Sequence, residues 1–85
     1  MSELSDKRIN MIKTVIPISV GNRIKYFRKQ QEMTQIELAN LAGKDRQYIY
    51  KIEKGIVTPN IVTIVILIES LNITVKDFFN KDFEY

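Results

Sequence analysis

The middle of the chain constrains the fold most, because it carries the signals of two short helices joined by a tight turn. Thr34 followed by Glu37 forms a capping box at the start of the first helix. Gly43 suits the left-handed residue that ends this helix. Asp45 can cap a second helix, which Gly55 stops. The spacing therefore predicts two consecutive short helices.

The rest of the chain predicts three further helices and no strand. Ser19 can cap a helix whose apolar residues fall at helical spacing. Thr58-Pro59 places a cap before a proline at the first helical position, opening a helix that reaches about Leu71. Thr74 and Asp77 repeat the capping box before a short last helix. Five helices with short connections predict an all-α bundle.

The amino-terminal segment leaves two structures open. Leu4, Ile9, Ile12 and Ile16 can line one helix face with Ser5 as the cap. The residues just before Pro17 can equally form a short extended piece, because proline disfavours helix in the residue that precedes it. We therefore divide the chain into an arm of undecided structure, a helical domain and a tail, which comprise residues 1–18, 19–79 and 80–85.

The composition argues against an enzyme and favours a binding module. The chain has 85 residues with no Cys and no His. It therefore lacks disulfides, thiolate metal sites and the commonest general base, and we expect no metal, cofactor or small-molecule ligand. We see no signal peptide, and the longest apolar run is too short to span a membrane. We therefore expect a cytoplasmic protein without membrane contact.

The basic residues are concentrated in the middle of the chain. Residues 21–54 carry eight Lys and Arg against four Asp and Glu, whereas residues 55–85 carry two against four. A basic segment of this kind suits a polyanionic partner, although a solvated helix face has a similar composition.

Many spaced residues together resemble one known family. They are Arg23-Ile24, Arg28, Thr34-Gln35, Glu37-Leu38-Ala39, Ala42-Gly43, Ile49, Ile52-Glu53-Lys54-Gly55, Pro59 and Leu71. The succession resembles the phage-repressor-like, Xre-type helix-turn-helix family over about residues 19–79. Asp45-Arg46 with Tyr48-Ile49, in so short a chain, also resembles the controller proteins of restriction–modification systems. The resemblance implies a lambda-repressor-like bundle and a sequence-specific regulator of transcription that binds double-stranded DNA.

The helix that follows Asp45 offers polar side chains from one face. Ile49, Ile52 and Glu53 share its inward side, and the outward residues can reach the edges of bases in a major groove. We predict that Arg46, Gln47 and Lys51 read bases and that Tyr50 lies at the edge of the contact. An ordinary solvated face is the alternative.

Several polar residues are candidates for contacts with DNA phosphates. Gln35 starts the first of the two short helices, where free backbone amides attract anions. The resemblance implies that this glutamine contacts the DNA backbone. The further candidates are Thr34, Tyr48, Lys54, Lys44 and Arg23.

Arg28 and Glu53 are predicted to form a structural pair. Each lies beside the apolar stripe of its helix, and a charge near the core needs a partner. The pair would brace the first helix against the helix that reads bases, as the resemblance also implies. The alternative is two independent surface charges.

A second apolar stripe predicts a homodimer. Val62, Val65 and Ile66 lie on the side of their helix that should meet water, and Phe79 and Phe83 can extend this surface. A dimer would place two recognition helices about 34 Å apart on a pseudo-palindromic operator. Burial of the stripe by the amino-terminal arm is an alternative. The stripe also leaves open another function, that of an antitoxin or interaction module whose main partner is a protein.

Overall fold

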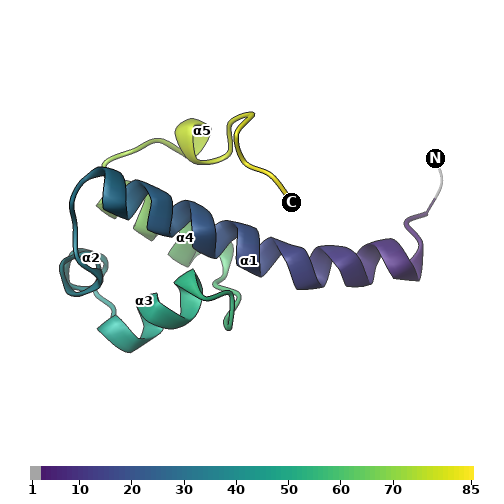
Figure 1. Cartoon of the computed structure of the whole chain (residues 1–85), viewed down its shortest axis with the longest axis horizontal. Coiled ribbons are helices and arrows are strands. Elements are labelled where there is room, and N and C mark those ends of the chain that lie inside the picture. Colours follow the sequence, from purple (N-terminus) through teal and green to yellow (C-terminus); the bar gives the residue numbers. More distant parts are fainter. Residues whose placement is uncertain (1–2) are drawn as a thin grey trace.

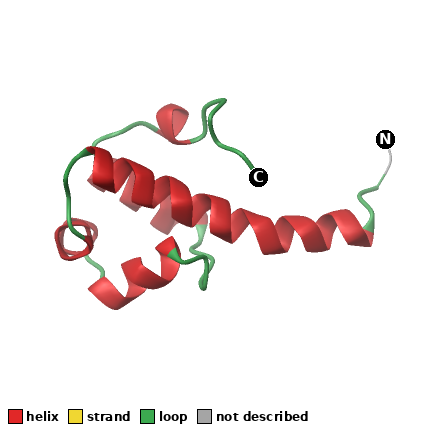
Figure 2. Ribbon diagram, viewed as in Figure 1, coloured by secondary structure: helices red, strands yellow, loops and turns green. Residues whose placement is uncertain are grey.

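Five helices follow one another along the chain in a computed structural model, which describes residues 3–85. They are α1 (Asp6–Gln30), α2 (Gln35–Ala42), α3 (Arg46–Glu53), α4 (Ile61–Ser70) and α5 (Val75–Phe78). No strand occurs within residues 3–85 (Figure 2). The prediction of an all-α, five-helix bundle is confirmed. No helix in this part of the chain combines the length and the apolar character needed to cross a bilayer.

The long helix α1 organises the molecule. Figure 1 shows α2 and α3 on one side of α1, and α5 with the carboxy-terminal tail on the other. α1 packs against α3, α2 packs against α3 and α4, and α4 packs against α5. The other helices surround only the second half of α1, so the first half extends beyond the bundle (Figure 1).

The turn between α2 and α3 forms as its residues predict. The hydroxyl of Thr34 accepts a hydrogen bond from the Glu37 N–H at 3.0 Å, and the Thr34 N–H donates to the Glu37 carboxylate at 2.9 Å. These bonds hold the pKa of Glu37 below its usual value, the backbone bond most strongly. Gly43 has φ 67°, the left-handed conformation expected of it. Asp45 caps α3 by accepting from the Tyr48 N–H at 2.8 Å.

The predicted start of the first helix at Ser19 is wrong. α1 begins at Asp6, and the Ser5 side chain caps it by accepting from the Arg8 N–H at 3.0 Å. Pro17 lies inside the helix without stopping it: burial of its ring in the packed part of α1 offsets the lost N–H bond and the crowding of the preceding turn. Of the two structures left open for residues 1–18, the helical one forms from residue 6 onward. The division between arm and domain stays a prediction, and it falls inside α1.

The prediction that Thr58 caps α4 is also wrong, because Asn60 caps this helix. The helix begins after Asn60, whose side chain accepts from the Thr63 N–H at 2.9 Å. Thr58 and Pro59 precede it in the connection from α3. Asparagine satisfies a first-turn N–H as well as threonine does, and its position brings Pro59 into the interior.

The core draws on all five helices. Its fully buried side chains include Ile24 of α1, Leu38 of α2, Ile49 of α3, Leu67 of α4 and Phe78 of α5. The half-buried Phe83 of the tail packs against this cluster. The core therefore fixes α3 relative to every other element.

Gly21 allows α1 and α3 to approach each other closely. A Cβ atom at this position would lie 2.1 Å from the Ile52 carbonyl oxygen and 3.0 Å from that of Glu53. Backbone atoms occupy this space, so a side chain here must push the end of α3 away from α1.

We expect Gly21→Ala to destabilise the protein by more than about 2 kcal/mol, because overpacking against backbone cannot be relieved by a rotamer change. For a domain of this size this lowers Tm by about 10 °C. The exposed neighbour gives the control Asn22→Ala, which should melt within about 2 °C of the parent chain. Equal melting temperatures for the two variants in thermal circular dichroism would contradict this account.

Candidate nucleic-acid interface

The carboxylate of Glu53 joins three helices. It accepts from Arg28 Nε at 2.7 Å and from Arg28 Nη2 at 2.9 Å. Gln35 Nε2 donates to the same carboxylate at 3.1 Å. The residues predicted to pair are thus joined in a two-bond contact that also includes α2. The hydrogen bond to Glu53 raises the pKa of Arg28, so the guanidinium stays charged.

The remaining Arg28 donor closes the connection between α1 and α2. Arg28 Nη1 donates to the Met33 carbonyl oxygen at 2.8 Å. Arg28 therefore binds the loop before α2 and the end of α3 at the same time. This arrangement fixes α2 and α3 against α1.

The outer face of α3 carries the residues predicted to read bases. Arg46, Gln47, Tyr50 and Lys51 are all exposed, whereas Ile49, Ile52 and Glu53 are buried. Arg46 is the first residue of α3. The helix therefore presents one guanidinium, one amide and one ammonium group along a single accessible side.

Two predicted phosphate contacts lie at the start of α2. Gln35 Nε2 has two hydrogens, and the bond to Glu53 uses only one of them. The N–H groups of Gln35 and Ile36 have no acceptor among residues 3–85. Both polar groups of Thr34 take part in the capping box with Glu37. Gln35 is thus better placed than Thr34 to donate to an anion.

The three predicted contacts on or next to α3 differ in exposure. Lys54 is exposed at the end of α3, with its ammonium 5.8 Å from the ring centre of Tyr50. Tyr48 is half-buried against the core, and Lys44 lies over its ring at 5.8 Å. All three remain close to the turn and to the outer face of α3.

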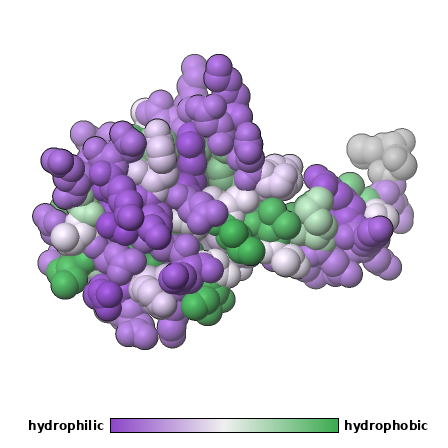
Figure 3. Space-filling model, viewed as in Figure 1, coloured by the Kyte–Doolittle hydropathy of each residue, from purple (hydrophilic) through white to green (hydrophobic). Residues whose placement is uncertain are grey.

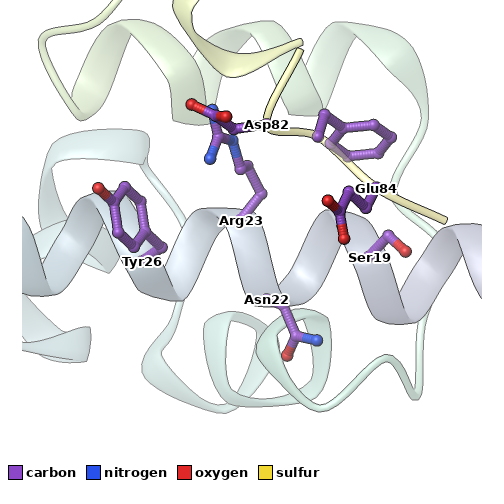
Figure 4. A pocket seen from close by; sticks show the side chains of 7 residues that line it. Ser19, Asn22, Arg23, Tyr26, Asp82 and Glu84 are labelled. Atoms are coloured by element: carbon purple, nitrogen blue, oxygen red, sulfur yellow. The ribbon is translucent and has the colours of Figure 1, made fainter. Parts of the chain in front are cut away.

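Arg23 does not join these residues. Its guanidinium donates to the carbonyl oxygens of Phe78 and Asp77, each at 3.0 Å, and to Asn80 Oδ1 at 2.8 Å. Figure 4 shows Arg23 reaching from α1 towards the tail, next to Asp82. These bonds use three of the five N–H groups of Arg23 on the end of α5 and on Asn80, so the structure places Arg23 apart from the other candidates, and its phosphate contact stays a prediction.

Two basic residues of α1 were missed. A hollow between α1, α2 and α3 contains five cationic side chains against one carboxylate, and its lining is Lys25, Arg28, Lys29, Gln35, Arg46, Tyr50, Glu53 and Lys54. Lys25 and Lys29 are exposed and one helical turn apart. Their spacing next to Arg28 was the available signal in the sequence. The surface over α2 and α3 is mostly hydrophilic (Figure 3).

Residues 24–78, more than half of the chain, match the family model described as helix-turn-helix. The chain belongs to the helix-turn-helix family. The resemblance expected from the sequence is confirmed, and the matched residues run from the middle of α1 to the end of α5.

Relatives of this helix-turn-helix chain come from a phage and from archaea. The immunity repressor protein of Bacillus phage phi105 is 36% identical over 65 residues, which cover 76% of this chain and 45% of the repressor. A putative transcriptional regulatory protein of Methanobrevibacter smithii is 38% identical over 72 residues, 76% of this chain and 23% of that protein. The chain thus spans less than half of these two relatives.

Two further matches cover nearly the whole of the other protein. An uncharacterised helix-turn-helix transcriptional regulator of Methanocaldococcus jannaschii is 33% identical over 58 residues, 68% of this chain and 88% of that regulator. The crystal structure of the restriction-modification controller protein C.AhdI from Aeromonas hydrophila has a TM-score of 0.72 and 29% identity. That match covers 76% of this chain and 98% of the controller protein.

We expect Glu53→Gln to destabilise the helix-turn-helix domain by about 3 kcal/mol or more, because it leaves the buried Arg28 guanidinium without its counter-charge. Thermal circular dichroism should record a Tm more than about 10 °C lower. The control Glu69→Gln removes the same charge from an exposed position of α4 and should leave Tm unchanged. A Glu53→Gln variant as stable as the control would show that the pair does not brace the fold.

Proposed function

We propose that this chain is a sequence-specific DNA-binding regulator of transcription that acts as a homodimer. The observation that carries the proposal is the exposed row of Arg46, Gln47 and Lys51 on α3, beside the basic hollow that α1 completes. A helix that offers such groups from one side fits the major groove of double-stranded DNA. Its relatives include a phage immunity repressor and a restriction-modification controller, and we propose a role of one of these kinds.

In this proposal α3 reads the base sequence. An arginine can donate two bonds to guanine O6 and N7, and a glutamine can pair with adenine N6 and N7. Arg46 and Gln47 occupy the first turn of α3, the end that enters a groove most deeply in this class of motif. Lys51 follows one turn later, and Tyr50 borders the contact. The network around Glu53 limits the movement of this helix.

The surrounding groups hold the DNA backbone. The second Gln35 Nε2 hydrogen and the free amides of Gln35 and Ile36 point to one phosphate at the start of α2. We assign Lys25 and Lys29 as further phosphate contacts, together with Lys54. The earlier candidates Tyr48, Lys44 and Thr34 complete this set; Thr34 is the least available because the ionised Glu37 lies beside it.

The apolar outer side of α4 supports the homodimer. Val62 is 64% exposed and Ile66 is 39% exposed, and the half-buried Val65 lies between them. Phe79 is 41% exposed, whereas Phe83 also packs against the core of its own chain. A monomer gains nothing from this surface, whereas two copies can bury it from water.

Selection from randomised double-stranded DNA tests the proposal. We expect two inverted half-sites whose centres lie about 10 base pairs apart, one per recognition helix. Arg46→Ala should weaken binding to the selected site by about 5- to 160-fold, the equivalent of about 1–3 kcal/mol, while the distant control Lys76→Ala should not. Failure to enrich any sequence over random DNA would contradict the proposed function.

The phosphate contacts are tested through the salt dependence of binding. Removing Lys25 and Lys29 together by alanine substitution should weaken specific and random DNA alike and reduce the slope of log K against log salt by about 2. Removing Lys76 and Lys81 in the same way makes the same charge change on the acidic half of the chain. An equal slope change in both double variants, measured by fluorescence anisotropy, would remove Lys25 and Lys29 from the interface.

A further inference from the structure

The first half of α1 is only partly covered by its own chain, because Ile12, Val15 and Ile16 are only half-buried. Residues 3–10 are all exposed, and the bundle begins only where Ile16 meets the core. The molecule measures 43 × 25 × 19 Å, and its radius of gyration of 13.6 Å exceeds the value of about 12 Å for a compact chain of this length. Figure 1 shows this projecting helix, residues 6–16, extending away from the other elements.

The projecting helix is amphipathic and short. Ile9, Ile12, Val15 and Ile16 share one side, while Asn10 lies on the opposite side. Most helical stability in proteins comes from the packing of an apolar face. At the outer end of this apolar side Ile9 is still exposed, and Ile12 and Val15 are only half-buried, so a further surface can cover them.

A matching apolar surface lies where α1 leaves the bundle. We call it the junction patch and define it by Ile18, Ile56, Ile61 and Val62, which are 46%, 65%, 63% and 64% exposed. Gly55 lies so close to Ile18 that an added Cβ would be 2.9 Å from Ile18 Cγ1, which places the connection after α3 against α1. Figure 3 shows hydrophobic surface gathered at this point.

We propose that the projecting helix of one chain packs on the junction patch and the outer side of α4 of a second copy, and that the second copy returns the same contact. This inference rests on the homodimer of the proposed function and names the element that completes its interface. Because a two-fold axis makes every contact twice, one arrangement covers the exposed parts of both surfaces in each chain.

Charge complementarity favours a second copy as the occupant. The projecting helix carries Lys7, Arg8 and Lys13 against Asp6, whereas residues 55–85 carry four acidic residues against two basic ones. Within one chain Arg8 already lies 5.9 Å from the ring centre of Tyr85, at the end of the acidic tail. A basic helix and an acidic carboxy-terminal half attract each other when they belong to different copies.

The area of the surfaces also favours this arrangement, in which each copy lends its projecting helix to the other. The alternative is a dimer in which only the two projecting helices contact each other. Eleven helical residues form a face about 16 Å long and 10 Å wide, about 160 Å². This is well below the roughly 800 Å² that each partner buries in a stable interface, even though the uneven side-chain surface is larger than this flat estimate. Adding the junction patch and the outer side of α4 brings the contact towards that size.

Thiol cross-linking tests the exchange, because the chain contains no cysteine of its own. An Ile12→Cys chain is mixed with a size-tagged Val62→Cys chain and mildly oxidised. We expect a disulfide between the two different chains. Adding denaturant before the oxidation should prevent this disulfide. Disulfides formed only between identical variants, or no disulfide at all, would overturn the proposal.

Sedimentation velocity provides a second measurement. Ile12→Glu should raise the dimer dissociation constant by more than about tenfold, since it places a carboxylate in an apolar contact. Asn10→Glu adds the same charge to the opposite side of the helix and should change the constant by less than about twofold. Equal effects from the two variants would also overturn the proposal. A chain that selects an inverted DNA site but fails both tests keeps the proposed function and loses only the exchange.

Discussion

The ion pair between Arg28 and Glu53 holds α1, α2 and α3 in one arrangement. Burying two charges costs desolvation energy, which only good geometry and additional hydrogen bonds offset. Here both conditions are met, because the Glu53 carboxylate accepts three bonds and Arg28 also binds the Met33 carbonyl. An apolar pair could stabilise the core equally well, but it would not fix the direction of α3 or orient Gln35. The pair therefore contributes geometry more than stability.

The helix α1 connects elements that the chain separates widely. Gly21 lets it touch the end of α3, and Arg28 binds that end about two turns later. On another side Arg23 binds the carbonyl oxygens at the end of α5, 54 and 55 residues further along the chain. These contacts fasten the carboxy-terminal half to the same helix that positions α3. Displacing α1 must therefore displace α3.

Local signals predicted much of this structure, and tertiary packing decided the rest. The cap of α3, the left-handed Gly43 and the capping boxes depend on residues three or four positions apart, so the sequence suffices to find them. Pairing Arg28 with Glu53 needed only the observation that each lies beside an apolar stripe. The continuation of α1 through Pro17 and the use of Arg23 on α5 depend on distant neighbours, which periodicity cannot reveal. Lys25 and Lys29 stand beside Arg28 in the sequence, but their proposed contact with DNA depends on the proximity of α3, which their spacing alone does not show.

The projecting helix and the lysines of the basic hollow belong to the same element, so the proposed dimer contact and the proposed DNA contact are linked through α1. Only three residues separate Pro17 from Gly21, where α1 touches the backbone of α3. α1 continues through Pro17 as one helix, so the same element carries both the projecting residues and the contact with α3. If the first half of α1 lies on a second copy, the separation of the two α3 helices is set through α1 itself as well as through α4. The spacing of two half-sites on DNA would then be specified by helix geometry rather than by a flexible connection.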